Sequence, residues 1–211
     1  MGLLKERRWQ EEIKKASKVI YESETTKSEA PQINTTLRSH ALTVPEEIGA
    51  CSGIVVFGKR IQSLVYTTDI AIIRNVNADA IFAVYPFSPQ PIISEMLIHA
   101  ADVPVFTGVG GGTTQGKRVV HLGQFAEMQG ASGVVVNSPT QNINVAAGSK
   151  TPKVVSEIRK INKNIPIIAT GGPTRESIKA TVAAGANAII WTPPSCSDIF
   201  GELMDAYREK K

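Results

Sequence analysis

Short apolar runs alternate with helical patterns along most of the chain. Apolar residues recur at helical spacing in four segments, at 69–75, 91–101, 117–129 and 174–184. The apolar runs are rich in Ile, Val, Phe and Ala, as strands buried on both faces are, and they start near residues 54, 80, 103, 133, 143, 166 and 188. This order predicts an α/β fold built on a parallel sheet.

The stretch from Ile165 to Pro194 predicts the fold more closely. It reads as an apolar strand, a glycine turn, a helix that Gly185 ends, and a second apolar strand at 188–191. Such a βαβ unit near the C-terminus is typical of the closing quarter of a TIM barrel. We therefore predict an α/β fold of the TIM (β/α)8 barrel type, with 1–211 as a single domain.

An additional helix is expected before the barrel. In residues 3–21, Trp9, Ile13, Ala16 and Ile20 recur at three- and four-residue spacing among Lys, Arg, Glu and Gln. We expect this amphipathic helix to lie against the bottom of the barrel or against a partner subunit. The polar, Ser/Thr-rich residues 22–31 predict a linker.

The alternation breaks after the run at 133–136. The next apolar run begins at Ile143, which leaves no room for the crossover that neighbouring parallel strands require. The count is seven strands, whereas a closed barrel has eight. One βα unit is therefore expected to be absent near residues 140–142, either because a segment is missing from the printed sequence or because it has been deleted.

Composition limits the classes of function. Hydrophobic residues at 42% and charged residues at 20% describe a soluble globular protein. No run approaches the roughly 20 apolar residues of a membrane span, and the first residues are charged, so we expect no membrane contact and a cytoplasmic location. The net charge of +4 suits anionic ligands, but acids interleave the bases, which argues against nucleic acid. Neither the two cysteines nor the histidine spacing predicts a metal site.

The glycine turn of the C-terminal unit is the first candidate site. Gly171 and Gly172 allow a close approach of the backbone, and Thr174 opens a helix whose free N–H groups favour an anion. Thr192 follows the last strand and is expected beside them. These residues predict a phosphate site. The alternative is a tight strand-to-helix turn without a ligand.

A glycine-rich loop at 108–118, GVGGGTTQGKR, is the second candidate. The N–H groups of Gly110, Gly111 and Gly112 could form an anion-binding nest, with Lys117 adding charge. The loop has neither the nucleotide P-loop spacing nor a dinucleotide fingerprint. A lid that closes over the barrel is the alternative reading.

Catalytic candidates follow from the strand ends. Lys59 follows the run at 54 and is expected at the barrel mouth as a base, a Schiff-base amine or a phosphate contact. Arg60 beside it is expected to bind the ligand as a second cation. Asp69 reads as a general base or as a helix cap. His40 is the histidine retained as a candidate. Two further residues at strand ends are expected to line the ligand, namely Tyr85 and Asn137.

Several stretches resemble a known group of proteins. They are Asn34–His40, Ser52–Asn75, Phe82–Ile93, Gly108–Arg118 and Gly171–Ser177. Together they resemble bacterial TIM-barrel proteins catalogued as "hydrolase", relatives of the phosphate-binding barrels. The resemblance implies a further strand and helix where this chain passes from Pro139-Thr140 to Asn144-Val145.

These observations predict an enzyme that acts on a small phosphorylated or otherwise anionic metabolite by hydrolysis, carbon–carbon cleavage or isomerisation. No cofactor is predicted, and the protein is expected to form a homo-oligomer. Two alternatives stay open. One is an FMN-dependent oxidoreductase, against which the Thr192-Pro193-Pro194 ending argues, and the other is a non-catalytic metabolite-sensing barrel.

Overall fold

The computed structural model describes residues 42–111, 114–137, 144–145 and 147–209. Outside them lie the expected helix at 3–21, the linker at 22–31, His40, Gly112 and the junction at 140–142. The described strands are β1 (Ile54–Val56), β2 (Lys59–Ile61), β3 (Ser63–Tyr66), β4 (Ala80–Ala83), β5 (Val105–Gly111), β6 (Gly133–Asn137), β7 (Asn144–Val145), β8 (Ile168–Thr170) and β9 (Ala188–Trp191). The described helices are η1 (Glu46–Ala50), α2 (Ile70–Asn75), α3 (Pro91–Ala100), α4 (Lys117–Met128), η2 (Gly148–Lys150), α5 (Thr151–Ile161), α6 (Arg175–Ala183) and α7 (Cys196–Glu209).

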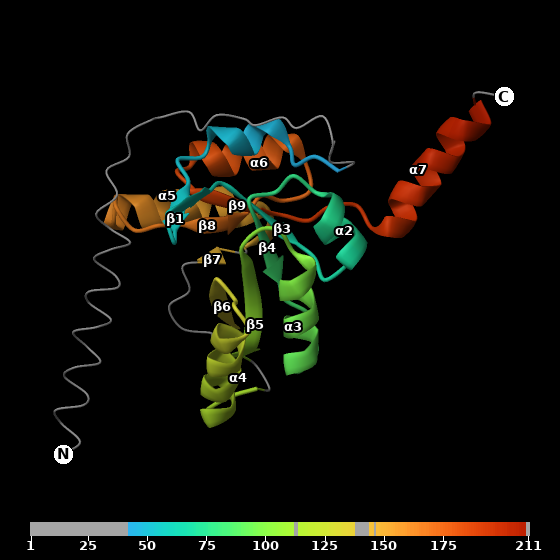
Figure 1. The fold of residues 1–211 in the computed structure, drawn as a ribbon. Coiled ribbons are helices and arrows are strands. Elements are labelled where there is room, and N and C mark those ends of the chain that lie inside the picture. The colour runs from blue at the N-terminus through green and yellow to red at the C-terminus, as the bar shows by residue number, and fades with distance from the viewer. Residues whose placement is uncertain (1–41, 112–113, 138–143, 146, 210–211) are drawn as a thin grey trace, which may run out of the picture.

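Seven strands form one curled parallel sheet in the order β6-β5-β4-β3-β9-β8-β7 (Figure 1). β6 and β7 follow each other in the chain yet lie at opposite edges of this sheet. A closed barrel would need one more strand between those two edges. The described residues therefore form an open part of a barrel rather than a complete (β/α)8 barrel. The sequence also predicted seven strands, but its set contained the run at 54, which lies in a separate hairpin, and lacked β3.

The sequence suggested that the apolar run at 54 is a barrel strand, but in the structure it belongs to a hairpin outside the parallel sheet. β1 and β2 pair antiparallel, with Val56 opposite Lys59, so that Phe57 and Gly58 form a two-residue loop. Both loop residues have positive φ, 48° and 78°, as a type I′ hairpin turn requires. The first parallel strand is β3, which pairs with both β4 and β9.

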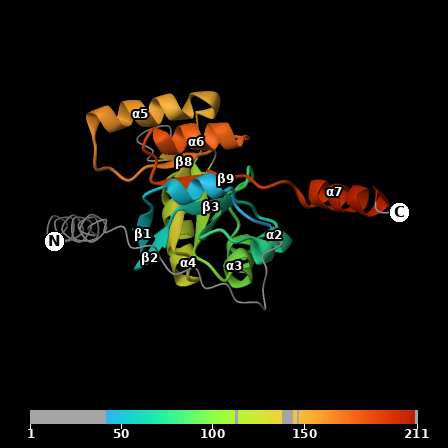
Figure 2. The same cartoon turned by 90° about the horizontal axis from the view of Figure 1, so that it is seen from above.

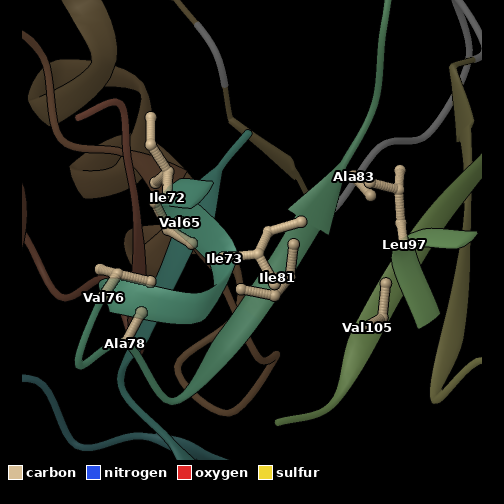
Figure 3. Packing of buried hydrophobic residues seen from close by; sticks show 9 residues of the cluster. All are labelled: Val65, Ile72, Ile73, Val76, Ala78, Ile81, Ala83, Leu97 and Val105. Atoms are coloured by element: carbon tan, nitrogen blue, oxygen red, sulfur yellow. The ribbon is translucent and has the colours of Figure 1, made fainter. Parts of the chain in front are cut away.

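Two faces of the sheet bury apolar side chains. Leu64, Phe82 and Ile190 belong to a cluster on the concave face, which Ile54 and Ile61 of the hairpin also join. Successive residues in a strand point to opposite faces, so the intervening residues lie against the helices. Figure 3 shows this outer cluster, in which strand residues meet those of α2 and α3; its members are Val65, Ile72, Ile73, Val76, Ala78, Ile81, Ala83, Leu97 and Val105.

The short helix η1 covers the outer face beside β9. Its Ile48 packs with Ile178 of α6 and Ile189 of β9, while Leu42 and Val44 reach the cluster beneath α2. In a closed barrel, the helix after the last strand lies at this place. Here η1 fills it, and α7, which follows β9, projects from the rest of the structure (Figures 1 and 2). No residue of α7 is buried. No helix among the described residues could span a membrane.

Candidate anion site at the carboxyl edge of the sheet

Parallel strands all end at one edge of their sheet, which is called the carboxyl edge below. Most predicted site residues lie at the strand ends or helix starts of this edge. They are Asp69 after β3, Tyr85 after β4, Gly110 and Gly111 in β5, Lys117 at the start of α4, Asn137 in β6, Gly171, Gly172 and Thr174 between β8 and α6, and Thr192 after β9.

Lys59 and Arg60 are exceptions, and their expected position at the mouth is wrong. Both belong to β2 of the hairpin, which precedes β3. Lys59 Nζ donates to the backbone oxygen of Asp79, 3.0 Å away, just before β4 begins. Arg60 donates to the backbone oxygen of Ser52. These cations therefore tie the hairpin to the end of the sheet opposite the carboxyl edge.

The two glycines between β8 and α6 serve different purposes. A Cβ on Gly171 would lie 2.8 Å from side-chain atoms of both Ile178 and Ile189, so this glycine allows α6 to pack closely on the sheet. Gly172 has a φ of 79°, which turns the chain into the helix and favours glycine. Gly171 is buried, and its N–H donates to the backbone oxygen of Ile190. Of the two glycines, the exposed Gly172 therefore fits the predicted contact with a ligand better.

The first turn of α6 already holds a negative charge. The Thr174 hydroxyl caps the helix by accepting a hydrogen bond from the Ser177 N–H at 3.2 Å. The Ser177 hydroxyl accepts one from the Thr174 N–H, also at 3.2 Å. The pKa of Glu176 is lowered, first because its carboxylate accepts a hydrogen bond from its own backbone N–H and next because it accepts one from the Thr174 hydroxyl. The charges of Lys179 and Arg175 lower it further. The helix start thus favours an anion.

Arg175 and Lys179 are shared between this turn and η1. Arg175 Nη1 lies 3.3 Å from Glu46 Oε1 and 3.5 Å from Glu47 Oε1, and Lys179 Nζ lies 3.8 Å from that same Glu47 oxygen. The Glu47 side chain is nearly buried, and its Oε2 has no hydrogen-bond partner in the described part of the chain. These ion pairs fasten η1 to α6 beside the turn.

The glycine-rich loop closes tightly on itself. The Gly111 N–H donates to Thr114 O at 2.9 Å, and the Thr114 N–H donates to Gly111 O at 3.3 Å. A Cβ on Gly110 would lie 2.5 Å from Val119 Cγ2 and 2.9 Å from Thr114 O. These contacts explain the glycine at 110 by packing against α4. They also leave the Gly111 N–H engaged within the protein.

Asp69 and Cys196 meet across two neighbouring strands. Asp69 follows β3 and caps α2, accepting from the Ala71 N–H at 2.8 Å. Its carboxylate also accepts a hydrogen bond from the Cys196 thiol at the start of α7, and this bond is the main cause that lowers the pKa of Asp69. The same bond raises the pKa of Cys196. Nothing in the sequence spacing indicated this pair, because 126 residues lie between the two in the printed chain.

Two tyrosines stand at the ends of β3 and β4. Tyr66 is partly exposed, and its ring lies 6.3 Å from that of Phe82, measured between centroids. The Tyr85 hydroxyl accepts from the Gln90 N–H at 2.8 Å and so fixes the segment that leads into α3. The sequence had singled out Tyr85 and missed Tyr66. The alternation within β3, which places Tyr66 on the same face as Leu64, is the signal that could have found it.

Comparison with known proteins gives limited similarity. No protein-family model and no curated protein match the chain. A glycerol uptake operon antiterminator regulatory protein from Listeria monocytogenes has a similar structure at 15% identity over 62% of each chain, with a TM-score of 0.23. A monomeric dihydrodipicolinate synthase variant has 16% identity over 62% of this chain and 61% of its own, with a TM-score of 0.40. The chain thus spans about three fifths of the length of these proteins. The assignment of a barrel-like fold rests on the strand order.

Proposed function

We propose that the carboxyl edge of the sheet binds a small phosphorylated or otherwise anionic metabolite at the turn between β8 and α6, and that the protein is an enzyme acting on this metabolite. The main support for this proposal is the position of Glu176. Its carboxylate lies at the helix start, where it receives hydrogen bonds from backbone and hydroxyl donors. A ligand phosphate would use the same donors, because both groups are anions with acceptor oxygens.

The neighbouring groups suit this ligand. The backbone of Gly172 faces the turn with a positive φ, and Thr192 follows the adjacent strand β9. Arg175 and Lys179 supply positive charge from α6 itself. Because the Glu176 side chain is exposed, a bound phosphate would displace its carboxylate from these donors into solvent. Glu176 then acts as a built-in competitor that weakens binding of any anion.

The proposal gives Asp69 no proton-transfer role. An efficient general base has a pKa near the working pH, whereas the Cys196 thiol and the α2 backbone lower the pKa of Asp69. The proposal also leaves Lys59 outside the site, because its ammonium group bonds to the Asp79 backbone oxygen at the other end of the sheet. Substrate positioning at the β8–α6 turn is therefore the part of the function on which the proposal rests.

Nuclear magnetic resonance of the Gly172 amide tests the binding. Titration with inorganic phosphate, and then with a panel of phosphorylated sugars and acids, should shift this resonance saturably. In the variant Gly172→Val, whose side chain would meet Ser177 at a backbone position with positive φ, the neighbouring amides of the turn should no longer respond to phosphate. Unfolding curves of the variant show whether the fold survives. A Gly172 resonance that stays unmoved up to millimolar phosphate and phosphorylated ligands would refute the proposal.

A further inference from the structure

The concave face of the sheet is more deeply covered at one end than at the other. At the amino end, Ile54 and Ile61 of the hairpin pack onto this face, and Leu64 of β3 is fully buried with them. Tyr66 lies two residues further along β3 and therefore on the same face, since side chains alternate along a strand. Tyr66 is 37% exposed. The face thus becomes accessible toward the carboxyl edge, where Tyr66 lies.

The ring of Tyr66 is supported by the neighbouring strand. In the register of β3 and β4, Tyr66 lies beside Phe82, and the two ring centroids are 6.3 Å apart at an interplanar angle of 37°. Phe82 is buried within the cluster of the concave face. Ring pairs at this separation attract each other, so Phe82 restrains the Tyr66 ring. The Tyr66 hydroxyl has no hydrogen-bond partner among the described residues.

The pairing of the strands sets Tyr66 at the same level as the turn between β8 and α6. Val65 pairs with Trp191, so Tyr66 is followed on β9 by Thr192 as its neighbour in register. On its other side β9 pairs with β8, which leads into Gly172. Neighbouring strands lie about 4.8 Å apart, so β3 and β8, with β9 between them, are about 10 Å apart. A ligand held at Gly172 can therefore extend across one strand to Tyr66.

The charge near Tyr66 disfavours a second anionic group on the ligand. Asp69 follows Tyr66 by three residues, at most about 10 Å of chain, which is within the screening length at physiological salt. The hydrogen bond from the Cys196 thiol is the main cause that lowers the pKa of Asp69, so this carboxyl group is ionised at neutral pH. Asp69 would repel a ligand carboxylate at this place but not a neutral hydroxyl.

We propose that Tyr66 binds the end of the substrate remote from its phosphate, and that the substrate is a phosphorylated sugar or polyol with a neutral, hydroxyl-bearing remote end. The inference rests on the proposed function, because the phosphate is taken to lie at Gly172. A tyrosine hydroxyl both donates and accepts hydrogen bonds, as the hydroxyl groups of a polyol do. Tyr66 is thus a specificity-determining residue of the site.

Three phosphate monoesters with carbon chains of equal length test this assignment. They are sorbitol phosphate, phosphogluconate and hexyl phosphate, each phosphorylated at a terminal carbon. Their remote ends are a hydroxyl group, a carboxylate and a methyl group. In calorimetric titrations, the wild type should bind sorbitol phosphate more tightly than either of the others. In Tyr66→Phe, the preference for sorbitol phosphate over hexyl phosphate should fall about fivefold, as expected for one lost hydrogen bond between neutral groups.

Two further variants complete the experiment. Tyr85→Phe is the matched control after the next strand, since the Tyr85 hydroxyl already accepts a hydrogen bond from the Gln90 N–H, and it should keep the wild-type preference. Asp69→Asn should raise the affinity for phosphogluconate relative to sorbitol phosphate, because it removes the repelling charge. A preference that falls equally in Tyr85→Phe and Tyr66→Phe would assign the recognition of the hydroxyl group elsewhere and overturn the role of Tyr66.

Inorganic phosphate separates this inference from the proposed function. Its affinity should be the same in Tyr66→Phe and the wild type, because it lacks the remote end that Tyr66 binds. If both proteins bind phosphate and show the same preference among the three monoesters, the role of Tyr66 is overturned and the anion site stands. If the wild type binds neither inorganic phosphate nor the monoesters, both proposals fall.

Discussion

The thiol of Cys196 donates a hydrogen bond to the carboxylate of Asp69, which joins the end of β9 to the end of β3 at the carboxyl edge of the sheet. This hydrogen bond is the main cause that raises the pKa of the thiol, and the negative charge of Asp69 raises it further, so the proton stays on sulfur. Cys196 is exposed, yet it is a poor nucleophile at neutral pH, since the thiolate is the reactive form.

Replacement of Asp69 by asparagine should make Cys196 more reactive. The variant Asp69→Asn removes the charge, so the pKa of the thiol falls toward its ordinary value and the thiolate fraction at pH 7.5 rises. Asparagine also caps helices well, so α2 should persist. Iodoacetamide should then alkylate Cys196 severalfold faster, as measured by mass spectrometry. Cys51 serves as the internal control, because burial raises its pKa to about 12. Equal alkylation rates in both proteins would exclude the thiol–carboxylate contact.

The hairpin turn should gain stability from a residue that tolerates positive φ. Phe57 has a φ of 48° and is 89% exposed. The substitution Phe57→Asn should raise the free energy of unfolding by about 1 kcal/mol, because asparagine adopts the left-handed region at lower cost. Gly58→Ala should lower it, since Gly58 has a φ of 78°. Urea unfolding measures both. A Phe57→Asn protein less stable than the wild type would show that the turn has another conformation.

Two buried threonines should respond in opposite directions to the same substitution. The Thr107 hydroxyl is buried without a hydrogen-bond partner in the described chain, whereas Thr181 Oγ1 donates to Ser177 O at 2.8 Å. Thr107→Val should leave stability equal or raise it by up to about 1 kcal/mol, and Thr181→Val should cost about 1 kcal/mol. Chemical denaturation compares the two. Equal losses would mean that Thr107 has a partner after all.

Lys59 should prove to be a structural residue. Its ammonium group bonds to the Asp79 backbone oxygen at the end of the sheet remote from Gly172. Lys59→Met should lower the free energy of unfolding by at most about 1 kcal/mol and leave the response of the Gly172 amide to phosphate unchanged. A lost phosphate response in a folded Lys59→Met protein would return this lysine to the site.

The sequence predicted well where local signals determine the structure. Pro91 begins α3 as expected of a proline at a helix start, and Thr174 with Ser177 forms a capping box at α6. Gly172 and Gly185 mark turns, and both have positive φ. The strand 188–191 has the expected limits. In each case the chemistry of the residue itself decides the backbone conformation.

The sequence predicted poorly where distant contacts decide. Phe57-Gly58 lacks the Asn-Gly or Asp-Gly signature of a type I′ turn, so the hairpin was read as one barrel strand and Lys59 was placed at the mouth. Gly171 was predicted to contact a ligand, which stays a prediction, whereas the close approach of Ile178 and Ile189 that also requires glycine there was not foreseen. The Asp69–Cys196 contact depends on which strands become neighbours. Strand order of that kind is a property of the whole sheet.

A comparison of phosphate affinity between the wild type and Glu176→Gln shows whether an anion binds at the turn between β8 and α6. If the Glu176 carboxylate lies where a ligand anion binds, its neutralisation removes a competitor and a repulsive charge. The Gly172 amide titration should then give a dissociation constant several times lower in Glu176→Gln than in the wild type. Glu127→Gln on α4, with the same change of charge at an exposed residue, should match the wild type. Unchanged or weaker phosphate binding in Glu176→Gln would contradict an anion site at this turn.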